Sequence, residues 1–168
     1  MQAPAPLIER GLVLRWLDSD DLPWLRDLYA TTRADEMAPL PWSAAQKRHF
    51  LDQQFTLQHD HFVRYYGGAD FLAIAHCDGQ PIGRYYVARG DSFHVVDIAL
   101  TPAYYRQGIG TALIEHTHAE AVERRRDVLL HVNKLNDRAV KLYSRLGFAV
   151  SGDVGSHWQM RWSPTKPG

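Results

Sequence analysis

The sequence predicts an α+β fold in which helices pack against a mixed β-sheet. Residues 71–100 contain three β-rich runs separated by Asp-Gly and Gly-Asp turns, a pattern typical of an antiparallel meander. Residues 108–132 then show a helical pattern followed by a strand, which implies a parallel crossover. With 168 residues, 45% of them hydrophobic, the chain can bury the core of one domain and is short for two.

The N-terminal part predicts one strand and two helices. Leu12–Trp16 is a β-rich run, and an acidic cluster followed by proline begins a predicted helix over residues 18–31. Residues 37–42 contain two prolines and are expected to form a loop. Ser43 and Gln46 have the spacing of a capping box, so a long helix is expected after them.

The middle of the chain predicts strands over 71–76, 82–89 and 93–100, the runs FLAIAH, IGRYYVAR and FHVVDIAL. A helix follows over 108–125, and VLLHV at 128–132 has the composition of a buried strand. The apolar residues expected to face the core from this helix are Ile109, Ala112, Leu113, Ala119 and Val122.

The C-terminal part predicts one more helix and two strands. The helix covers 136–146 and is amphipathic, and Gly147 is expected to end it. Short strands are expected at 148–150 and 158–162. The sequence contains no internal repeat, so one domain over residues 1–168 is the expectation.

Composition excludes several classes of protein. The single cysteine, Cys77, rules out an internal disulfide framework and fits a reducing compartment, so a cytoplasmic location is expected. No N-terminal leader pattern and no run near the ~20 apolar residues of a membrane helix occur, so no membrane association is expected. A net charge of zero argues against a general nucleic-acid binder.

Nine histidines raise the question of a metal site. The pairs His59/His61 and His116/His118 are two residues apart, so on a helix their side chains diverge. We therefore predict no metal.

The stretch YYRQGIGTALI, residues 104–114, places a glycine-rich turn at the start of a helix. Such a turn offers unpaired backbone N–H groups and the positive end of the helix dipole, which suit phosphate oxygens. The turn lacks the Lys-Ser/Thr of a P-loop, and Leu113 replaces the third glycine of a dinucleotide fingerprint. Anion binding is the first hypothesis, and a tight turn that merely uses glycine is the alternative.

Three segments together resemble the acetyl-CoA site of the GCN5-related N-acetyltransferase (GNAT) superfamily. They are DIALTPAYYRQGIGTALI, the strand LLHV, and VNKLNDRAVKLYSRLGF. The last carries the family's helix signature at Asn136, Ala139, Leu142, Tyr143, Gly147 and Phe148.

The resemblance implies a three-layer α/β/α fold whose mixed, mostly antiparallel central sheet has a splayed parallel strand pair at the acyl-CoA site. It implies a single GNAT domain over 1–168, divided into four parts. These are acceptor-side helices (1–70), the meander (71–100), the acetyl-CoA-binding core (97–148) and C-terminal strands (149–162).

The resemblance also assigns residues to the co-substrate, acetyl-CoA. Backbone groups of Ile98, Ala99 and Leu100 would contact the pantetheine arm, as an added strand does. The amides that would hold the pyrophosphate belong to Arg106, Gln107, Gly108, Ile109, Gly110 and Thr111. Tyr105 departs from the family pattern, which has Gln or Arg there. Asn136 and Tyr143 would contact the cofactor; Asn136 could also cap its helix, and its two roles are compatible.

The implied activity is transfer of an acetyl group from acetyl-CoA to a primary amine by direct attack in a ternary complex. Tyr143, protonated at neutral pH because of its reference pKa of ~10, is the expected general acid, and an ordinary core tyrosine is the alternative. His131 is the first candidate base, because it stands where relatives often carry a glutamate. Asp97 is the second, and either could act through water.

The acceptor is expected to be a small molecule or a protein N-terminus or lysine, and a homodimer stays open. Candidates to line the acceptor site are Arg33, Glu36, Trp42 and Tyr85. A non-catalytic acyl-CoA-binding regulatory or scaffold domain is the alternative function. Loss of the general acid would mark such a domain, whereas Tyr143 is present.

Overall fold

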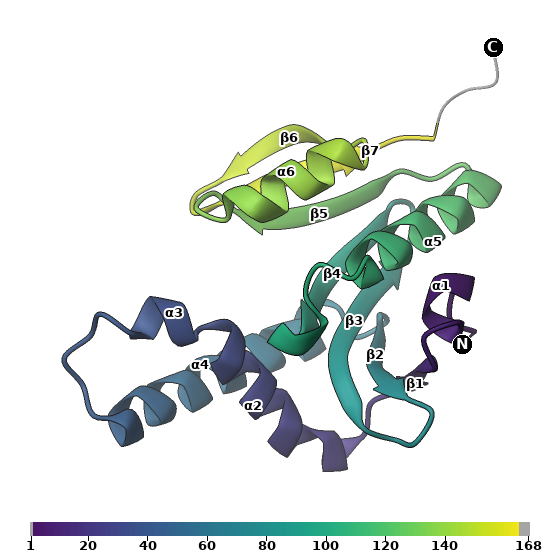
Figure 1. Cartoon of the computed structure of the whole chain (residues 1–168). Coiled ribbons are helices and arrows are strands. Elements are labelled where there is room, and N and C mark those ends of the chain that lie inside the picture. Colours follow the sequence, from purple (N-terminus) through teal and green to yellow (C-terminus); the bar gives the residue numbers. More distant parts are fainter. Residues whose placement is uncertain (1, 165–168) are drawn as a thin grey trace.

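A seven-stranded mixed sheet, in the order β1-β2-β3-β4-β5-β7-β6, forms the centre of the computed structural model, which describes residues 2–164 (Figure 1). All neighbouring strands are antiparallel except β4 and β5. The predicted mixed, mostly antiparallel sheet is confirmed. The strands are β1 (Leu12–Trp16), β2 (Asp70–His76), β3 (Pro81–Arg89), β4 (Phe93–Leu100), β5 (Val128–Asn133), β6 (Ala149–Val154) and β7 (His157–Trp162).

Helices follow the predicted order, with two additions. The predicted capping box begins α4: the Ser43 side chain accepts from the Gln46 amide at 3.1 Å, and the Gln46 side chain accepts from the Ser43 amide at 2.9 Å. Two short helices, α1 and α3, were not predicted. The helices are α1 (Ala5–Ile8), α2 (Leu22–Thr32), α3 (Ala34–Met37), α4 (Ala44–Tyr65), α5 (Ile109–Arg124) and α6 (Asp137–Arg145). None of the helices within residues 2–164 has the length and apolarity needed to cross a bilayer.

Two adjacent tyrosines on β3 show how the helices form layers on the sheet. Successive strand residues point to opposite faces. The Tyr85 hydroxyl hydrogen-bonds Thr117 of α5, whereas the Tyr86 ring meets Phe62 of α4 edge-on at 5.9 Å. Helices α5 and α4 therefore cover opposite faces, and α1 packs beside α5 through the buried Leu7. The three-layer arrangement is confirmed.

The buried face of α5 differs from the predicted stripe. Ala119 and Val122 are exposed, and Thr117 and Ala121 are buried in their place. Leu113, Thr117 and Ala121 follow one another at i, i+4 and i+8, so they share the face that meets the sheet. A threonine is acceptable there because its hydroxyl donates to the Leu113 carbonyl at 2.9 Å and pairs with a tyrosine on β3.

The parallel pair β4–β5 holds together for only part of its length. Phe93, His94 and Val95 pair with Val128, Leu129 and Leu130, and the pairing then stops. The register between β3 and β4 shifts at this point, because Val87 pairs with Val95 but Tyr86 pairs with Asp97. Such a bulge bends the strand that carries it. The remaining part of β4 diverges from β5, which with β6, β7 and α6 forms a separate flank of the sheet (Figure 1). The predicted splayed pair is confirmed.

Candidate active site

A cavity of about 870 Å³ lies where β4 and β5 diverge. Its walls come from parts of the chain that are distant in sequence. They include residues 95–100 of β4, 130–133 of β5, the start of α5, residues of α6, a group from α2, α3 and α4, and single residues of β3 and β7. The Gly-rich turn, the signature helix and the predicted acceptor-side helices therefore meet at one site.

The turn before α5 has the geometry of an anion cradle. Gly108 and Arg106 both adopt left-handed backbone conformations, with φ of 79° and 59°. The amides at Ile109, Gly110 and Thr111 lie in the first helical turn, where no intrahelical acceptor exists for them. A Cβ built on Gly110 would meet nothing within 4 Å, so space is open beside the backbone where this residue lines the cavity. The residues present fit a pyrophosphate.

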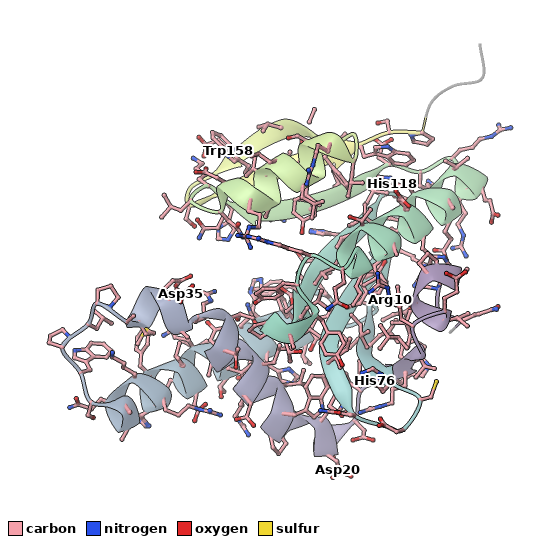
Figure 2. All side chains as sticks on the ribbon, viewed as in Figure 1. Arg10, Asp20, Asp35, His76, His118 and Trp158 are labelled. Carbon is pink, nitrogen blue, oxygen red and sulfur yellow. The ribbon has the colours of Figure 1, made fainter. Side chains whose placement is uncertain are left out.

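Gln107 holds the turn in place through its side chain. Its amide nitrogen donates to the Ala103 carbonyl at 2.8 Å, and its amide oxygen accepts from Arg10 at 3.0 Å. Arg10, labelled in Figure 2, lies in the turn that follows α1. The segment after this unpredicted helix thus contacts the cradle.

One edge of β4 is unpaired where it borders the cavity. Ile98, Ala99 and Leu100 pair with β3 on one side, while parallel pairing with β5 has already ended at Val95. At Gly83 of β3, a Cβ would come within 2.4 Å of the Ala99 carbonyl oxygen, so only glycine permits this close approach. The free edge fits an extended, amide-bearing chain such as pantetheine.

Tyr143 and Asn136 reach the cavity from α6. The Tyr143 ring packs edge-on against Phe148 at 5.9 Å. Burial, and secondarily the negative charge of Asp97, raise the pKa of Tyr143 to about 12, so its hydroxyl is protonated at neutral pH. Asn136 caps α6, since its side-chain oxygen accepts from the Ala139 amide at 3.1 Å. The cap is confirmed, and the same residue also lines the cavity.

Asp97 lies in the cavity wall in an ion pair. One of its carboxylate oxygens accepts from Arg84 Nε at 2.5 Å. Arg84, only 4% exposed, also donates to Gln58 of α4 at 2.7 Å. Burial opposes the charge of this guanidinium, but interactions with the Asp97 carboxylate and with Tyr86 together outweigh burial, so the pKa of Arg84 is raised. Asp97 thus compensates a buried cation, which is costly to leave unpaired.

Sequence reasoning overlooked Arg84 and Gln58, although both line the cavity. The available signal was an arginine inside the run IGRYYVAR, because a charged residue within a strand buried on both faces needs a partner.

His131 lines the cavity from β5, where the predicted fully buried strand instead alternates buried and more exposed residues. Its Nδ1 atom lies 3.2 Å from Nε2 of His94 on β4. Partial burial, followed by the nearby His157, lowers the pKa of His131. The ring is therefore neutral at pH 7 and able to accept a proton.

Two of the four predicted acceptor-site residues lie at the cavity. Arg33 and Glu36 line it and hydrogen-bond each other at 3.2 Å. Tyr29 and Thr32, one turn earlier on α2, were not predicted and line it as well.

The other two lie elsewhere. Trp42 is 41% exposed and packs edge-on against Phe50 at 5.5 Å, outside the cavity lining. Tyr85 is 1% exposed and faces α5, so the expectation that it lines the acceptor site is corrected. In β3 it is the neighbouring Arg84 that faces the cavity, because adjacent strand residues face opposite sides.

Within residues 2–164, the structure shows no group of three or more His, Cys, Asp or Glu side chains arranged to hold a metal ion.

Fold and site together define an α/β/α protein whose sheet opens at one parallel pair beside a glycine-entered helix. The acetyltransferase (GNAT) family matches residues 24–148, and the chain belongs to this family. The resemblance seen in the sequence is confirmed.

Curated relatives include mycothiol acetyltransferases from two bacteria. That of Frankia casuarinae is 28% identical over 176 residues, covering 93% of this chain and 47% of the relative. That of Clavibacter michiganensis is 36% identical over 73 residues, covering 44% of this chain and 24% of the relative. This chain thus spans half or less of the length of these relatives.

A solved structure supports the fold. The PaiA N-acetyltransferase from Thermoplasma acidophilum, crystallised with coenzyme A, superimposes with a TM-score of 0.67 at 18% identity, covering 90% of this chain and 98% of that chain.

Proposed function

We propose that this protein transfers an acetyl group from acetyl-CoA to a primary amine of a small molecule, peptide or protein, by direct attack in a ternary complex. The observation that carries the proposal is that one cavity joins the amide cradle, the free edge of β4, Tyr143 and His131. The family to which the chain belongs supports the reaction class.

The cradle and the strand edge account for co-substrate binding. Amides of Arg106–Thr111 would hold the pyrophosphate, and the unpaired backbone of Ile98–Leu100 would hold the pantetheine arm. Acetyl-CoA supplies an activated acetyl group as a thioester. Everything else that the reaction needs is proton transfer and orientation.

Tyr143 is the proposed general acid. A hydroxyl with a pKa of about 12 keeps its proton at neutral pH, so Tyr143 is present as a donor that can share this proton with the departing thiolate while the C–S bond breaks. The presence of this hydroxyl on the cavity wall favours an enzyme over a non-catalytic acyl-CoA-binding domain.

His131 is the proposed base. Its pKa is lowered, so the neutral ring is the main form at pH 7 and can accept a proton from the acceptor ammonium. Asp97 is less suited, because its carboxylate is already committed to the buried Arg84. Its proposed role is electrostatic, as the anion that compensates this cation and raises the pKa of Tyr143.

Thiol release from acetyl-CoA, measured against a panel of amines, tests the proposal. The panel contains polyamines, amino acids, aminoglycosides and peptides with a free N-terminus or lysine, together with the acceptor of the mycothiol acetyltransferases. We expect at least one class to be acetylated, with the product confirmed by mass spectrometry. Tight binding of acetyl-CoA without transfer to any member would favour the regulatory or scaffold alternative.

A further inference from the structure

Two histidines from neighbouring strands are in direct contact at the wall of the cavity. His94 Nε2 lies 3.2 Å from His131 Nδ1, and the ring centroids are 5.0 Å apart. Tyr66, at the end of α4, meets the His94 ring edge-on at 5.1 Å. His94 is not among the cavity-lining residues, so it can act on a substrate only through His131.

We propose that His94 is a positioning residue that fixes the tautomer of His131, so that Nε2 of His131 carries the lone pair that takes the proton. The inference rests on the proposed function, because it assigns the support of its base. In this arrangement the Nδ1–H of His131 donates to Nε2 of His94.

The direction of this hydrogen bond follows from the two protonation states. A protonated His131 carries hydrogen on both ring nitrogens, so Nδ1 can only donate, and His94 Nε2 must accept. If Nδ1 already donates in the neutral state, proton uptake at Nε2 requires no rearrangement of the pair. The opposite tautomer would leave a hydrogen on Nε2, and its lone pair, on Nδ1, would face His94 and not the substrate.

The surroundings keep His94 neutral, and the neutral tautomer with its hydrogen on Nδ1 leaves Nε2 free to accept. Burial, and next the charge of His131, lower the pKa of His94 to about 4, so its ring is neutral at pH 7. The groups that face the pair are Tyr66 from α4 and, from β7, His157 and Gln159. His157 lowers the pKa of His131 and Gln159 raises it.

The proton balance of the reaction shows what the pair must do. The acceptor arrives as an ammonium ion, a C–N bond forms and the thioester C–S bond breaks. Sulfur gains one proton through Tyr143, which is restored by the second proton leaving nitrogen. One proton per transfer is therefore left over, and His131 receives it at Nε2 and releases it to solvent between turnovers.

The test compares His94→Phe, which keeps a ring but no acceptor, with His94→Gln, which offers a side-chain oxygen. His118→Phe is the matched control. His118 is also half-buried with a pKa lowered to about 4 by burial, but it stacks on Trp162 at 3.9 Å and does not line the cavity (His118 is labelled in Figure 2). Long-range ¹⁵N spectra of the imidazole rings report the His131 tautomer without substrate, and kcat/KM against pH reports catalysis.

We expect wild-type His131 to carry its neutral-state proton on Nδ1, and His94→Phe to move it to Nε2. In His94→Phe, kcat/KM should fall about tenfold or more. The ascending limb of its pH profile should move to lower pH, because the imidazolium loses an acceptor. His94→Gln should restore most of both properties, and His118→Phe should match the wild type.

Three results would overturn the proposal. One is a wild-type spectrum with the proton on Nε2, which needs no variant and so decides the matter even if His94→Phe fails to fold. The second is an unchanged tautomer in folded His94→Phe. The third is a His94→Phe variant in which the His131 tautomer changes but kcat/KM and its pH profile remain those of His118→Phe. A wild type that binds acetyl-CoA but acetylates nothing would instead sink the proposed function, while the spectra would still decide the pairing.

Discussion

Replacing Gly110 should affect stability and ligand binding in opposite directions. The fold should be as stable as before or more stable, whereas binding of the pyrophosphate should weaken. A Cβ at this position meets nothing within 4 Å, and Gly110 is not among the residues with positive φ. Alanine should therefore stabilise the first turn of α5 by ~0.5–1 kcal/mol. Glutamate adds a negative charge near the helix N-terminus, which is itself favourable by ~0.3–1 kcal/mol. Neither substitution should lower the melting temperature.

Binding of coenzyme A should nonetheless weaken sharply in Gly110→Glu. At an effective dielectric constant of ~20, two like charges ~4 Å apart repel by about 4 kcal/mol, and partial relaxation would leave roughly 2–4 kcal/mol. Since 1.4 kcal/mol is tenfold in affinity, Kd should rise by about 30- to 1,000-fold. Gly110→Ala, which has no charge, should lose less.

Isothermal titration calorimetry with coenzyme A, run beside thermal melts of the same three proteins, measures both quantities. A folded Gly110→Glu variant with wild-type affinity would refute the reasoning and reduce the motif to a plain tight turn.

Four further outcomes are expected. Acetyl-CoA at a hundredfold excess over Kd should stabilise the protein by ~2.7 kcal/mol, and a flat melting temperature up to millimolar ligand would contradict binding. Tyr143→Phe should lower kcat by about 10² or more and leave acetyl-CoA affinity nearly unchanged. The thiol-release assay measures kcat, and calorimetry measures the affinity. His131→Ala should remove the ascending limb of kcat/KM against pH, whereas Asp97→Asn should keep it; identical profiles would leave water as the base. The pKa of Asp21 is lowered to about 2, first by its hydrogen bonds from Arg15, so this carboxylate stabilises the fold above pH ~4 and loses that contribution as pH falls toward 2. Asp21→Asn should therefore lower the free energy of unfolding by roughly 2 kcal/mol at pH 7. Measured by urea titration, the free energy of unfolding of the variant should depend less on pH over that acid range than that of the wild type.

Elements whose signals are local were predictable from the sequence. The Ser43–Gln46 capping box, the turns of the meander and the Asn136 cap each depend on residues within a few positions of one another, and the structure contains all three. The glycine-entered helix is of the same kind, because its left-handed Gly108 and its first-turn amides belong to one contiguous stretch. The part of the candidate site proposed to bind acetyl-CoA was therefore predictable, because its signals lie within short stretches of the sequence.

Features that depend on distant partners were not predictable. One of the two hydrogen-bond partners that satisfy the buried Thr117 is Tyr85, on a strand 32 residues away. Arg10, just after the short helix α1, hydrogen-bonds Gln107, just before α5, and the two residues are 97 positions apart. No periodicity within either segment contains such information, so Ala119 and Val122 looked equally suited to the core.

The contact between His94 and His131 depends on the register of the β4–β5 strand pair, which the sequence pattern of each strand alone does not give. His94 and His131 lie 37 residues apart, and each was visible as a histidine in a predicted strand. Their contact follows from the parallel register, in which His94 is opposite Leu129. Because side chains alternate along a strand, Leu129 and His131 share a face with His94, whereas a slip of one residue would turn the two imidazoles to opposite sides of the sheet. Burial fixes that register: Val95, Val128 and Leu130 are buried in the common core, so His94, Leu129 and His131 must face the opposite side of the sheet. The apolar residues of β4 and β5 thereby determine where the proposed base and its support meet.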